Sequence, residues 1–211
     1  MKILFYGDSI TDMGRARDVN APNVASYGSG YPFFVAGDLL KEDPKNYELI
    51  NRGISGNRVV DLYARIKMDA WNLEPDVFSI LIGINDIWHE IGQKNGVELD
   101  RFENIYRLLI EETKVRLPQT KIMLMEPFVL HGNATDNAYE QFCEVYKYAA
   151  VVKKLAEEYD LIFVPLQDVL TKAAEENGPK PYLYDGVHPG VAGARLIADE
   201  WLKAFRERVL K

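Results

Sequence analysis

The chain of 211 residues contains one cysteine, Cys143, and three histidines. A single cysteine cannot close a disulfide within the chain, so the sequence carries no sign of an oxidising compartment. No segment approaches the roughly 20 apolar residues that a membrane helix needs. The apolar stretch at residues 3–6 is also too short for the core of a signal peptide. We therefore expect a cytoplasmic protein that does not enter a membrane.

Positive charge is also in short supply. The chain has 25 Lys and Arg against 32 Asp and Glu, which leaves a net charge of -7. This is the wrong sign for binding the phosphates of nucleic acid or an anionic lipid surface. The composition, 47% hydrophobic and 27% charged, is that of a globular protein, and we expect a single domain over residues 1–211. Surface aromatic residues are compatible with self-association into a homo-oligomer, whose symmetry the sequence does not define.

Short apolar runs rich in branched and aromatic residues alternate with longer stretches of helical period. The runs predict β-strands at residues 2–6, 48–51, 76–82, 121–126 and 161–165. The clearest helices are expected at residues 101–116, 139–159 and 191–209. This alternation is typical of an α/β fold, in which a five-stranded parallel sheet lies between two layers of helices as a three-layer α/β/α sandwich.

In an open parallel sheet, ligands bind beyond the carboxyl ends of the strands, so the residues that follow each strand are candidates for chemistry. Polar, turn-rich blocks follow the first three strands at residues 7–12, 51–57 and 83–88. A fourth block at residues 184–190, before the last helix, places a carboxylate and an imidazole three residues apart. Ligand-binding residues are therefore expected in these four blocks.

Three residues in these blocks have the chemistry of a nucleophilic triad: Ser9, His188 and Asp185. A serine hydroxyl becomes a good nucleophile when a histidine takes its proton, and a carboxylate holds that histidine in the right tautomer. Acyl transfer also needs hydrogen-bond donors for the oxyanion that forms. The backbone N–H groups of Ser9 and Gly56 and the side-chain amide of Asn85 are candidates for this role.

The four blocks resemble those of the SGNH or GDSL-type hydrolases, with Gly7-Asp8-Ser9 first, Ile54-Ser55-Gly56 second, Gly83-Ile84-Asn85-Asp86 third and Asp185-Gly186-Val187-His188-Pro189 fourth. The resemblance implies a flavodoxin-like SGNH hydrolase fold and an esterase that needs no cofactor. It also implies Ser9 as the nucleophile, Asp185 and His188 as the rest of the triad, and Ser9, Gly56 and Asn85 as the oxyanion hole. Gly53 is the alternative to Gly56, which we prefer because the family's donor glycine follows the small residue of the second block.

Other residues compete for these roles. Ser55 is a rival nucleophile, but residues 53–57 end in asparagine and do not complete a Gly-x-Ser-x-Gly elbow. His89 and His131 lack a carboxylate three residues before them, and we do not expect either to be the base, although His89 can line the pocket. Asp8 is interpreted as a hydrogen-bond acceptor that orders its loop.

Among SGNH hydrolases, the first three blocks look most like those of acetylxylan esterases and related carbohydrate acetylesterases. Trp88 lies just beyond Asn85, and Tyr184 just before Asp185. These two side chains are candidates for the substrate pocket, closing the acyl side to all but a small group, although Trp88 can equally be a packing residue. The expected partner is a small-molecule or oligosaccharide ester. Short-chain acyl esters, acyl thioesters and lysophospholipids remain alternative substrates.

Two other classes of function remain open. The first is a metal-dependent phosphoesterase, with Asp8, Asp12, Asn85, Asp86 and His188 as ligands, but three histidines are few for such a site and we expect no metal. The second is a carbohydrate-binding domain without catalysis, which an intact Ser, Asp and His set disfavours. Hydrolysis of short-chain acetyl esters is therefore the function predicted from the sequence.

Overall fold

The computed structural model describes residues 1–18 and 23–211. A five-stranded parallel sheet runs through its centre, in the order β2-β1-β3-β4-β5. The strands are β1 (Lys2–Gly7), β2 (Glu48–Asn51), β3 (Val77–Leu81), β4 (Lys121–Met125) and β5 (Ile162–Val164). This strand order is that of the flavodoxin-like doubly wound fold, in which the ligand site lies where the order reverses, beside β1 and β3.

Helices connect the strands. The longer ones are α2 (Tyr31–Glu42), α3 (Val59–Asp69), α4 (Ile84–Gln93), α5 (Leu99–Arg116), α7 (Val145–Glu158), α8 (Gln167–Asn177) and α9 (Val191–Arg208). The short ones are α1 (Ser9–Asp12), η1 (Val24–Tyr27), η2 (Trp71–Leu73), η3 (Asp136–Ala138) and α6 (Tyr139–Phe142). No helix within the described residues is long and apolar enough to cross a bilayer.

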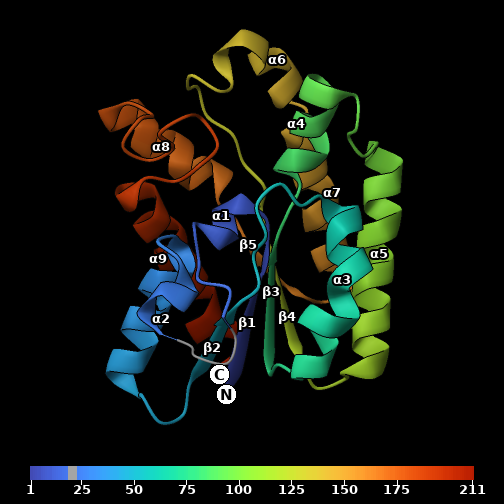
Figure 1. The fold of residues 1–211 in the computed structure, drawn as a ribbon, viewed down its shortest axis with the longest axis vertical. Coiled ribbons are helices and arrows are strands. Elements are labelled where there is room, and N and C mark those ends of the chain that lie inside the picture. Colours follow the sequence, from blue (N-terminus) through green and yellow to red (C-terminus); the bar gives the residue numbers. More distant parts are fainter. Residues whose placement is uncertain (19–22) are drawn as a thin grey trace.

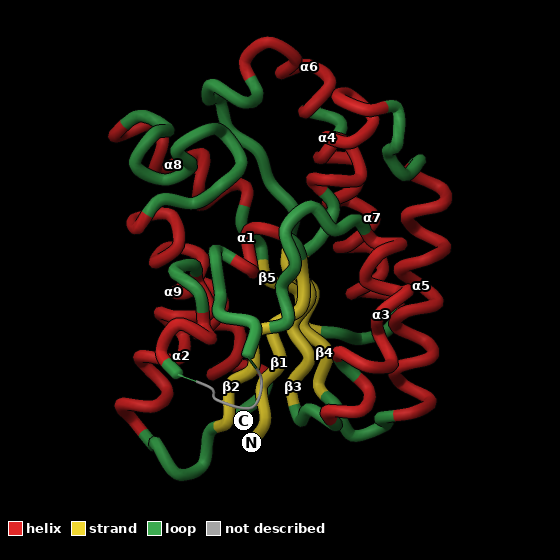
Figure 2. The backbone as a smooth tube through the Cα atoms, viewed as in Figure 1, coloured by secondary structure: helices red, strands yellow, loops and turns green. Residues whose placement is uncertain are grey.

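The helices form a layer on each face of the sheet. Helices α2 and α9 pack together on one face, and α3, α5 and α7 cover the other (Figure 1). The backbone view shows the strands enclosed between these layers, with α1, α4 and α6 beyond their carboxyl ends (Figure 2). The three-layer α/β/α sandwich predicted from the sequence is confirmed.

Burial explains why the central strands have nearly continuous apolar sequences. All five residues of β3 are buried, as are five of the six in β1. Trp201 of α9 is fully buried, lies 5.4 Å from the ring of Phe5 and donates its indole N–H to Ser79 Oγ at 2.9 Å. The indole nitrogen thus has a hydrogen-bond partner inside the core, which offsets the free-energy cost of burying it.

One predicted helix is wrong in its continuity. The sequence pattern favours a single helix over residues 139–159, but the chain forms α6 and α7, separated by Cys143 and Glu144. Around this break, Glu144 N–H donates to Gln141 O and Tyr146 N–H to Cys143 O, three residues back instead of four. Phe142 packs edge-on against Trp88 of α4, with ring centroids 5.6 Å apart. This contact between distant segments accompanies the change of direction at the break. The local sequence pattern did not predict the break.

The stretch from Gly28 to Phe34 enters a helix. Gly30 is the N-cap of α2, and Tyr31 and Pro32 begin the helix as buried residues. Proline is favoured in the first turn of a helix because its missing N–H would have no partner there. Phe5 packs edge-on against Tyr31, with ring centroids 5.6 Å apart, so this segment joins the core.

Candidate active site

Ser9 lies where β1 ends and α1 begins. The carboxylate of Asp8 accepts the N–H of Ile10 at 2.9 Å and so caps the short helix. Asp8 is buried, and its Oδ2 atom has no hydrogen-bond partner within the described residues. Burial raises the pKa of Asp8 to about 7, against a smaller opposing effect of the Ile10 N–H. Asp8 therefore orders the loop that presents Ser9, and it does so as the hydrogen-bond acceptor expected from the sequence.

Asp185 and His188 share a tight turn before α9. Asp185 Oδ1 accepts the backbone N–H groups of Val187 at 2.9 Å and His188 at 2.7 Å. A β-bridge between Leu183 and Pro189 closes the base of the turn. The spacing of three residues thus lets one carboxylate bind both the backbone and the side chain of the same histidine.

The fold brings the first block and the fourth block together. His188 Nδ1 lies 2.7 Å from Asp185 Oδ2, and His188 Nε2 lies 2.8 Å from Ser9 Oγ. An ionised carboxylate can only accept a hydrogen bond, so the proton of neutral His188 belongs on Nδ1. Nε2 is then free to accept the hydroxyl proton of Ser9, which is the arrangement a general base requires.

The charge states of this pair follow from their surroundings. Burial favours a higher pKa for Asp185, but hydrogen bonds from the His188 ring and from two backbone N–H groups outweigh it, so the pKa lies below its ordinary value. Burial favours a lower pKa for His188, but the hydrogen bond and charge of Asp185, with a contribution from Asp8, raise it above its ordinary value. The histidine is thus made more basic while its carboxylate stays ionised.

Two backbone N–H groups near Ser9 are available to a ligand. Within the part of the chain that the structure describes, the N–H groups of Ser9 and Gly56 have no hydrogen-bond partner. The N–H of Gly53, in contrast, donates to Asn51 Oδ1 at 2.8 Å. Gly56 has a φ of +83°, a backbone conformation that residues other than glycine rarely adopt. Of the two glycines considered from the sequence, Gly56 is therefore the one with a free donor.

Asn85 lies in the first turn of α4 and is buried. Its Nδ2 donates to the backbone oxygen of Asn57 at 3.1 Å, which uses one of two amide hydrogens. The next residue, Asp86, accepts the N–H of Val59 at 3.0 Å, and burial holds its pKa well above the usual value. These contacts tie the third block to the end of the second.

Aromatic rings flank His188. The Trp88 ring centroid lies 5.8 Å from that of His188, and the Trp88 indole is half-buried against Phe142. The Tyr184 ring lies 5.8 Å from the His188 ring, at 18° to its plane, and 51% of Tyr184 is exposed. Both residues proposed for the substrate pocket thus adjoin the histidine.

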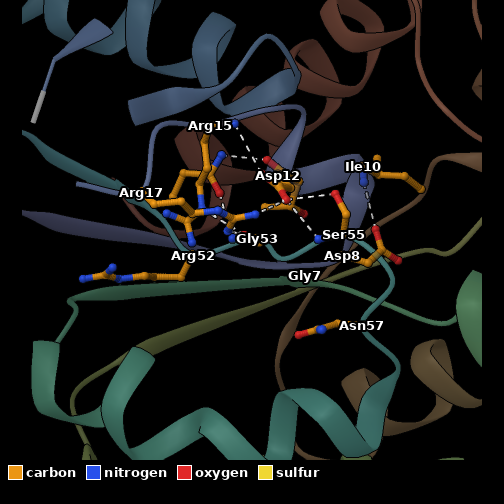
Figure 3. Close-up of polar contacts among 12 residues, drawn as sticks. Gly7, Asp8, Ile10, Asp12, Arg15, Arg17, Arg52, Gly53, Ser55 and Asn57 are labelled. Carbon is orange, nitrogen blue, oxygen red and sulfur yellow. Dashed lines mark hydrogen bonds and ion pairs between the residues drawn. The ribbon is translucent and has the colours of Figure 1, made fainter. Parts of the chain in front are cut away.

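Ser55, the rival nucleophile, is held by a carboxylate. Its Oγ and its N–H both lie 2.9 Å from Asp12 Oδ2 (Figure 3). Arg17 Nη2 lies 2.6 Å from the same oxygen. Within the described residues the side-chain partner of Ser55 is thus the Asp12 carboxylate and not a histidine, and Asp12 binds the second block. Among residues 1–18 and 23–211, no three Asp, Glu, His or Cys side chains are grouped as metal ligands.

The other two histidines lie apart from the hydroxyl of Ser9. His89 Nε2 is 4.0 Å from the position a Cβ would take on Gly56, so this side chain adjoins the second block. Its Nδ1 atom is buried without a partner among the described residues. His131 is exposed, stacks on Tyr139 and bonds Asp136 Oδ1 at 2.9 Å. That aspartate lies five residues after the histidine, outside the spacing considered from the sequence.

Sequence analysis missed Arg65, which connects two of the blocks from helix α3. Its Nη2 donates to the carbonyl oxygen of Gly7 at 3.1 Å, and its Nη1 donates to that of Arg52 at 2.9 Å. Its Nε donates to Asn57 Oδ1 at 2.7 Å. The sequence offers no signal for this role, because an arginine within a helix looks like a solvated surface residue.

Comparison with known proteins agrees with this geometry. The model of the GDSL-like lipase/acylhydrolase family matches residues 5–196. This chain belongs to that family. It is therefore a carboxylic ester hydrolase, and the family predicted from the four blocks is confirmed.

Similar proteins extend the comparison over nearly the whole chain. An acetylxylan esterase from Geobacillus stearothermophilus is 39% identical, over 96% of this chain and 92% of that protein. The crystal structure of Axe2, an acetylxylan esterase from Geobacillus stearothermophilus, matches with a TM-score of 0.86 at 38% identity, covering 96% of this chain and 93% of that one. A putative GDSL-like lipase from Parabacteroides merdae has a TM-score of 0.90 at 40% identity, with 96% and 94% covered.

Proposed function

We propose that this protein is a serine esterase that removes acetyl groups from xylo-oligosaccharides or related acetylated carbohydrates. The observation that carries the proposal is the chain of hydrogen bonds from Ser9 through His188 to Asp185. The similarity to an acetylxylan esterase over 96% of the chain supports the choice of substrate class.

In the proposed first half-reaction, Ser9 Oγ attacks the carbonyl carbon of the ester while His188 Nε2 takes the hydroxyl proton. The bond between the carbonyl carbon and the sugar oxygen then breaks, and the sugar alcohol leaves with that proton. The acetyl group remains on Ser9. Water repeats the sequence in the second half-reaction and releases acetate, which restores the serine.

The tetrahedral intermediate needs hydrogen-bond donors for its oxyanion, and three are proposed: the N–H of Ser9, the N–H of Gly56 and Asn85 Nδ2. The two N–H groups are free within the described residues, which supports their assignment. The contact of Asn85 with Asn57 holds the amide group in place before substrate binds. Donors placed in advance stabilise the developing charge without reorganisation during the reaction.

Trp88 and Tyr184 are proposed to contact the substrate on either side of His188. The exposed Tyr184 ring offers an apolar face on which a sugar ring can pack. Trp88, half-buried against Phe142, is suited to limiting the space for the acyl group. A small acyl group on a carbohydrate alcohol fits this arrangement.

A substrate panel tests the proposal. Acetylated xylo-oligosaccharides, nitrophenyl esters of increasing chain length, an acyl thioester and a lysophospholipid are compared by kcat/KM with one preparation. We expect the acetylated substrates to be preferred and the Ser9→Ala variant to be inactive on them. A tenfold or greater preference for longer acyl chains contradicts the acetyl assignment, and wild-type rates in Ser9→Ala contradict the nucleophile.

We also propose that the enzyme works in the cytoplasm on soluble acetylated oligosaccharides. The single cysteine, Cys143, supports a protein that needs no oxidising compartment. Cell fractionation followed by immunodetection tests this, and recovery in the culture medium contradicts it.

A further inference from the structure

Four hydrogen-bond donors surround the carboxylate of Asp12, the last residue of α1. Its Oδ2 atom accepts from the Ser55 N–H at 2.9 Å, from Ser55 Oγ at 2.9 Å and from Arg17 Nη2 at 2.6 Å. Its Oδ1 atom accepts the N–H of Arg15 at 3.2 Å. The Asp12 side chain is 3% exposed, so these four donors replace water around a buried charge.

These contacts join the two segments that carry the proposed nucleophile and one proposed oxyanion donor. Asp12 is the last residue of α1, the four-residue helix that Ser9 begins. Ser55, which binds Asp12 through both its backbone and its side chain, immediately precedes Gly56. A single carboxylate therefore links the helix that Ser9 begins to the residue that precedes Gly56.

Neighbouring contacts hold Gly53, nearer the other end of the second block, against residues 15–17, which follow α1. The carbonyl oxygen of Gly53 accepts Arg15 Nε at 2.8 Å and Arg17 Nη1 at 2.9 Å, so Arg17 bridges Gly53 and Asp12 (Figure 3). A Cβ on Gly53 would lie 2.3 Å from the backbone nitrogen of Asp12, which shows how closely the two backbones approach. Next to Gly56, the contact between the second block and a charged group of α1 is the one that Ser55 makes with Asp12.

We propose that Asp12 is a positioning residue for the esterase reaction, which sets the place of the Gly56 N–H relative to Ser9 by holding Ser55. This inference rests on the proposed function and adds a residue to it. Asp12 does not touch the reacting atoms. Its effect is on an interaction that forms with the oxyanion, so its loss lowers kcat and leaves KM largely unchanged.

The change Asp12→Asn tests the role of the charge at constant shape. An amide offers one oxygen and one NH2 group, so a donor of the amide must face a donor of Ser55, Arg15 or Arg17. We expect kcat for an acetyl ester to fall about 10- to 100-fold, because a displacement of about 1 Å at a catalytic group costs this much. We expect KM to stay within about threefold, since ground-state binding does not depend on the oxyanion donors.

Ser55→Ala is a milder second variant. It removes the Oγ contact with Asp12 and keeps the backbone N–H contact, so it leaves the buried charge with three donors. We expect a kcat loss of about three- to tenfold and a lower melting temperature, because the loss of one hydrogen bond to a charged group costs about 1.5 to 3 kcal/mol in the free energy of unfolding. If Asp12→Asn does not fold, this variant still decides, and an unchanged kcat in Ser55→Ala then overturns the proposal.

Glu126→Gln is the matched control. Glu126 Oε2 accepts two backbone N–H groups, those of Leu166 at 2.7 Å and Gln167 at 2.9 Å, at the start of α8. The change from carboxylate to amide is the same, but it lies away from residues 7–12 and 53–57. We expect a lower melting temperature with kcat close to that of the wild type. A similar loss of kcat in this control and in Asp12→Asn overturns the positioning role.

A double-mutant cycle separates positioning from general destabilisation. Asp12→Asn is measured in the wild type and in the Asn85→Ala background, at a temperature where every variant is folded. If the two changes act independently, their costs in activation free energy add, so their fold-losses of kcat multiply. If both changes weaken the same oxyanion site, the fold-loss of the double variant differs from that product. Fully multiplicative losses, or an Asp12→Asn enzyme with unchanged kcat, overturn the proposal.

The same set of measurements separates this inference from the proposed function. If the wild-type protein hydrolyses no acetyl ester in the panel, the proposed function fails. If the wild type is active, Ser9→Ala is inactive and Asp12→Asn retains full kcat, the function stands and the role of Asp12 alone is wrong.

Discussion

His188 Nε2 lies 2.8 Å from Ser9 Oγ, although 179 residues separate them in the chain. The fold explains the approach. Ser9 follows β1, a central strand, and His188 immediately precedes α9, which packs beside α2 against the same face of the sheet. The carboxyl end of β1 and the turn before α9 therefore meet at one edge of the sheet. Most of the chain lies between these two segments in sequence but takes no part in the contact.

Asp185→Asn is expected to lower kcat by up to about 10⁴-fold, because an amide can leave His188 in the wrong tautomer. The pH profile carries a second expectation. His188 must be neutral to act as the base, so activity rises as pH increases through its pKa. Asp185 holds that pKa above its ordinary value, and without it burial lowers the pKa. The acidic limb of kcat/KM against pH should therefore move to lower pH in the variant. An unshifted limb would argue against Asp185 as the partner of His188.

Asn85→Ala is expected to lower kcat by about 10² to 10³, or about 3 to 4 kcal/mol in the transition state, through loss of one oxyanion donor. KM should change little. Asn85→Asp keeps the shape of the side chain and removes its donors, so we expect a loss of similar size. Steady-state kinetics on an acetyl ester, with melting temperatures for both variants, makes the comparison. Near wild-type kcat in Asn85→Asp would remove Asn85 from the oxyanion hole.

Gly132→Ala should destabilise the turn that carries Asp185. A Cβ at this position would lie 2.2 Å from the Asp185 carbonyl carbon and 2.3 Å from the Gly186 nitrogen, both of them backbone atoms. We expect a cost of about 1 to 3 kcal/mol in the free energy of unfolding and a loss of kcat as Asp185 shifts.

Gly37→Ala, within α2, is the matched control for this substitution, because nothing lies within 4 Å of its Cβ position. It should stabilise the protein by up to about 1 kcal/mol. Denaturant unfolding measures both variants. Equal stability of Gly132→Ala and the wild type would contradict the close approach of these two loops.

Asp8→Asn is expected to change how stability depends on pH. Burial raises the pKa of Asp8 from 3.8 to about 7 in the folded protein. The folded state therefore keeps this proton in a range where the unfolded chain releases it, and the stability that Asp8 contributes is lost as pH rises from about 4 to about 7. The Asn variant cannot release a proton, so it should gain stability relative to the wild type over that range, on the order of 4 kcal/mol. Denaturant melts at pH 4, 5.5 and 8 test this, and a constant difference across them would contradict it.

Much of the fold was readable from local patterns. The strand at residues 48–51 was placed with its observed bounds, and the other four strands were placed within one residue at each end. Buried parallel strands have continuous apolar sequences, and the helices between them have a regular period, so both signals are local. The helix break at Cys143 was not readable, because the contact of Phe142 with Trp88 joins segments that are distant in the chain.

The candidate site divides in the same way. The order of residue types along the chain was enough to select Ser9, Asp185, His188 and Asn85, since each follows a strand or precedes the last helix in a recognisable block. The preference for Gly56 over Gly53 came from the family resemblance, and the folded chain supplies its physical reason, because the N–H of Gly53 is already bound by Asn51.

The proposed role of Asp12 and the contacts of Arg65 could be found only from the folded chain. Their partners lie 43 and 58 residues away in Ser55 and Gly7. A hydrogen bond is defined by the distance and direction between two groups, and for groups so far apart in the chain only the packing of helices on the sheet sets these. Residue types and their spacing therefore identify the chemistry, whereas the groups that hold it in place become visible only when the chain is folded.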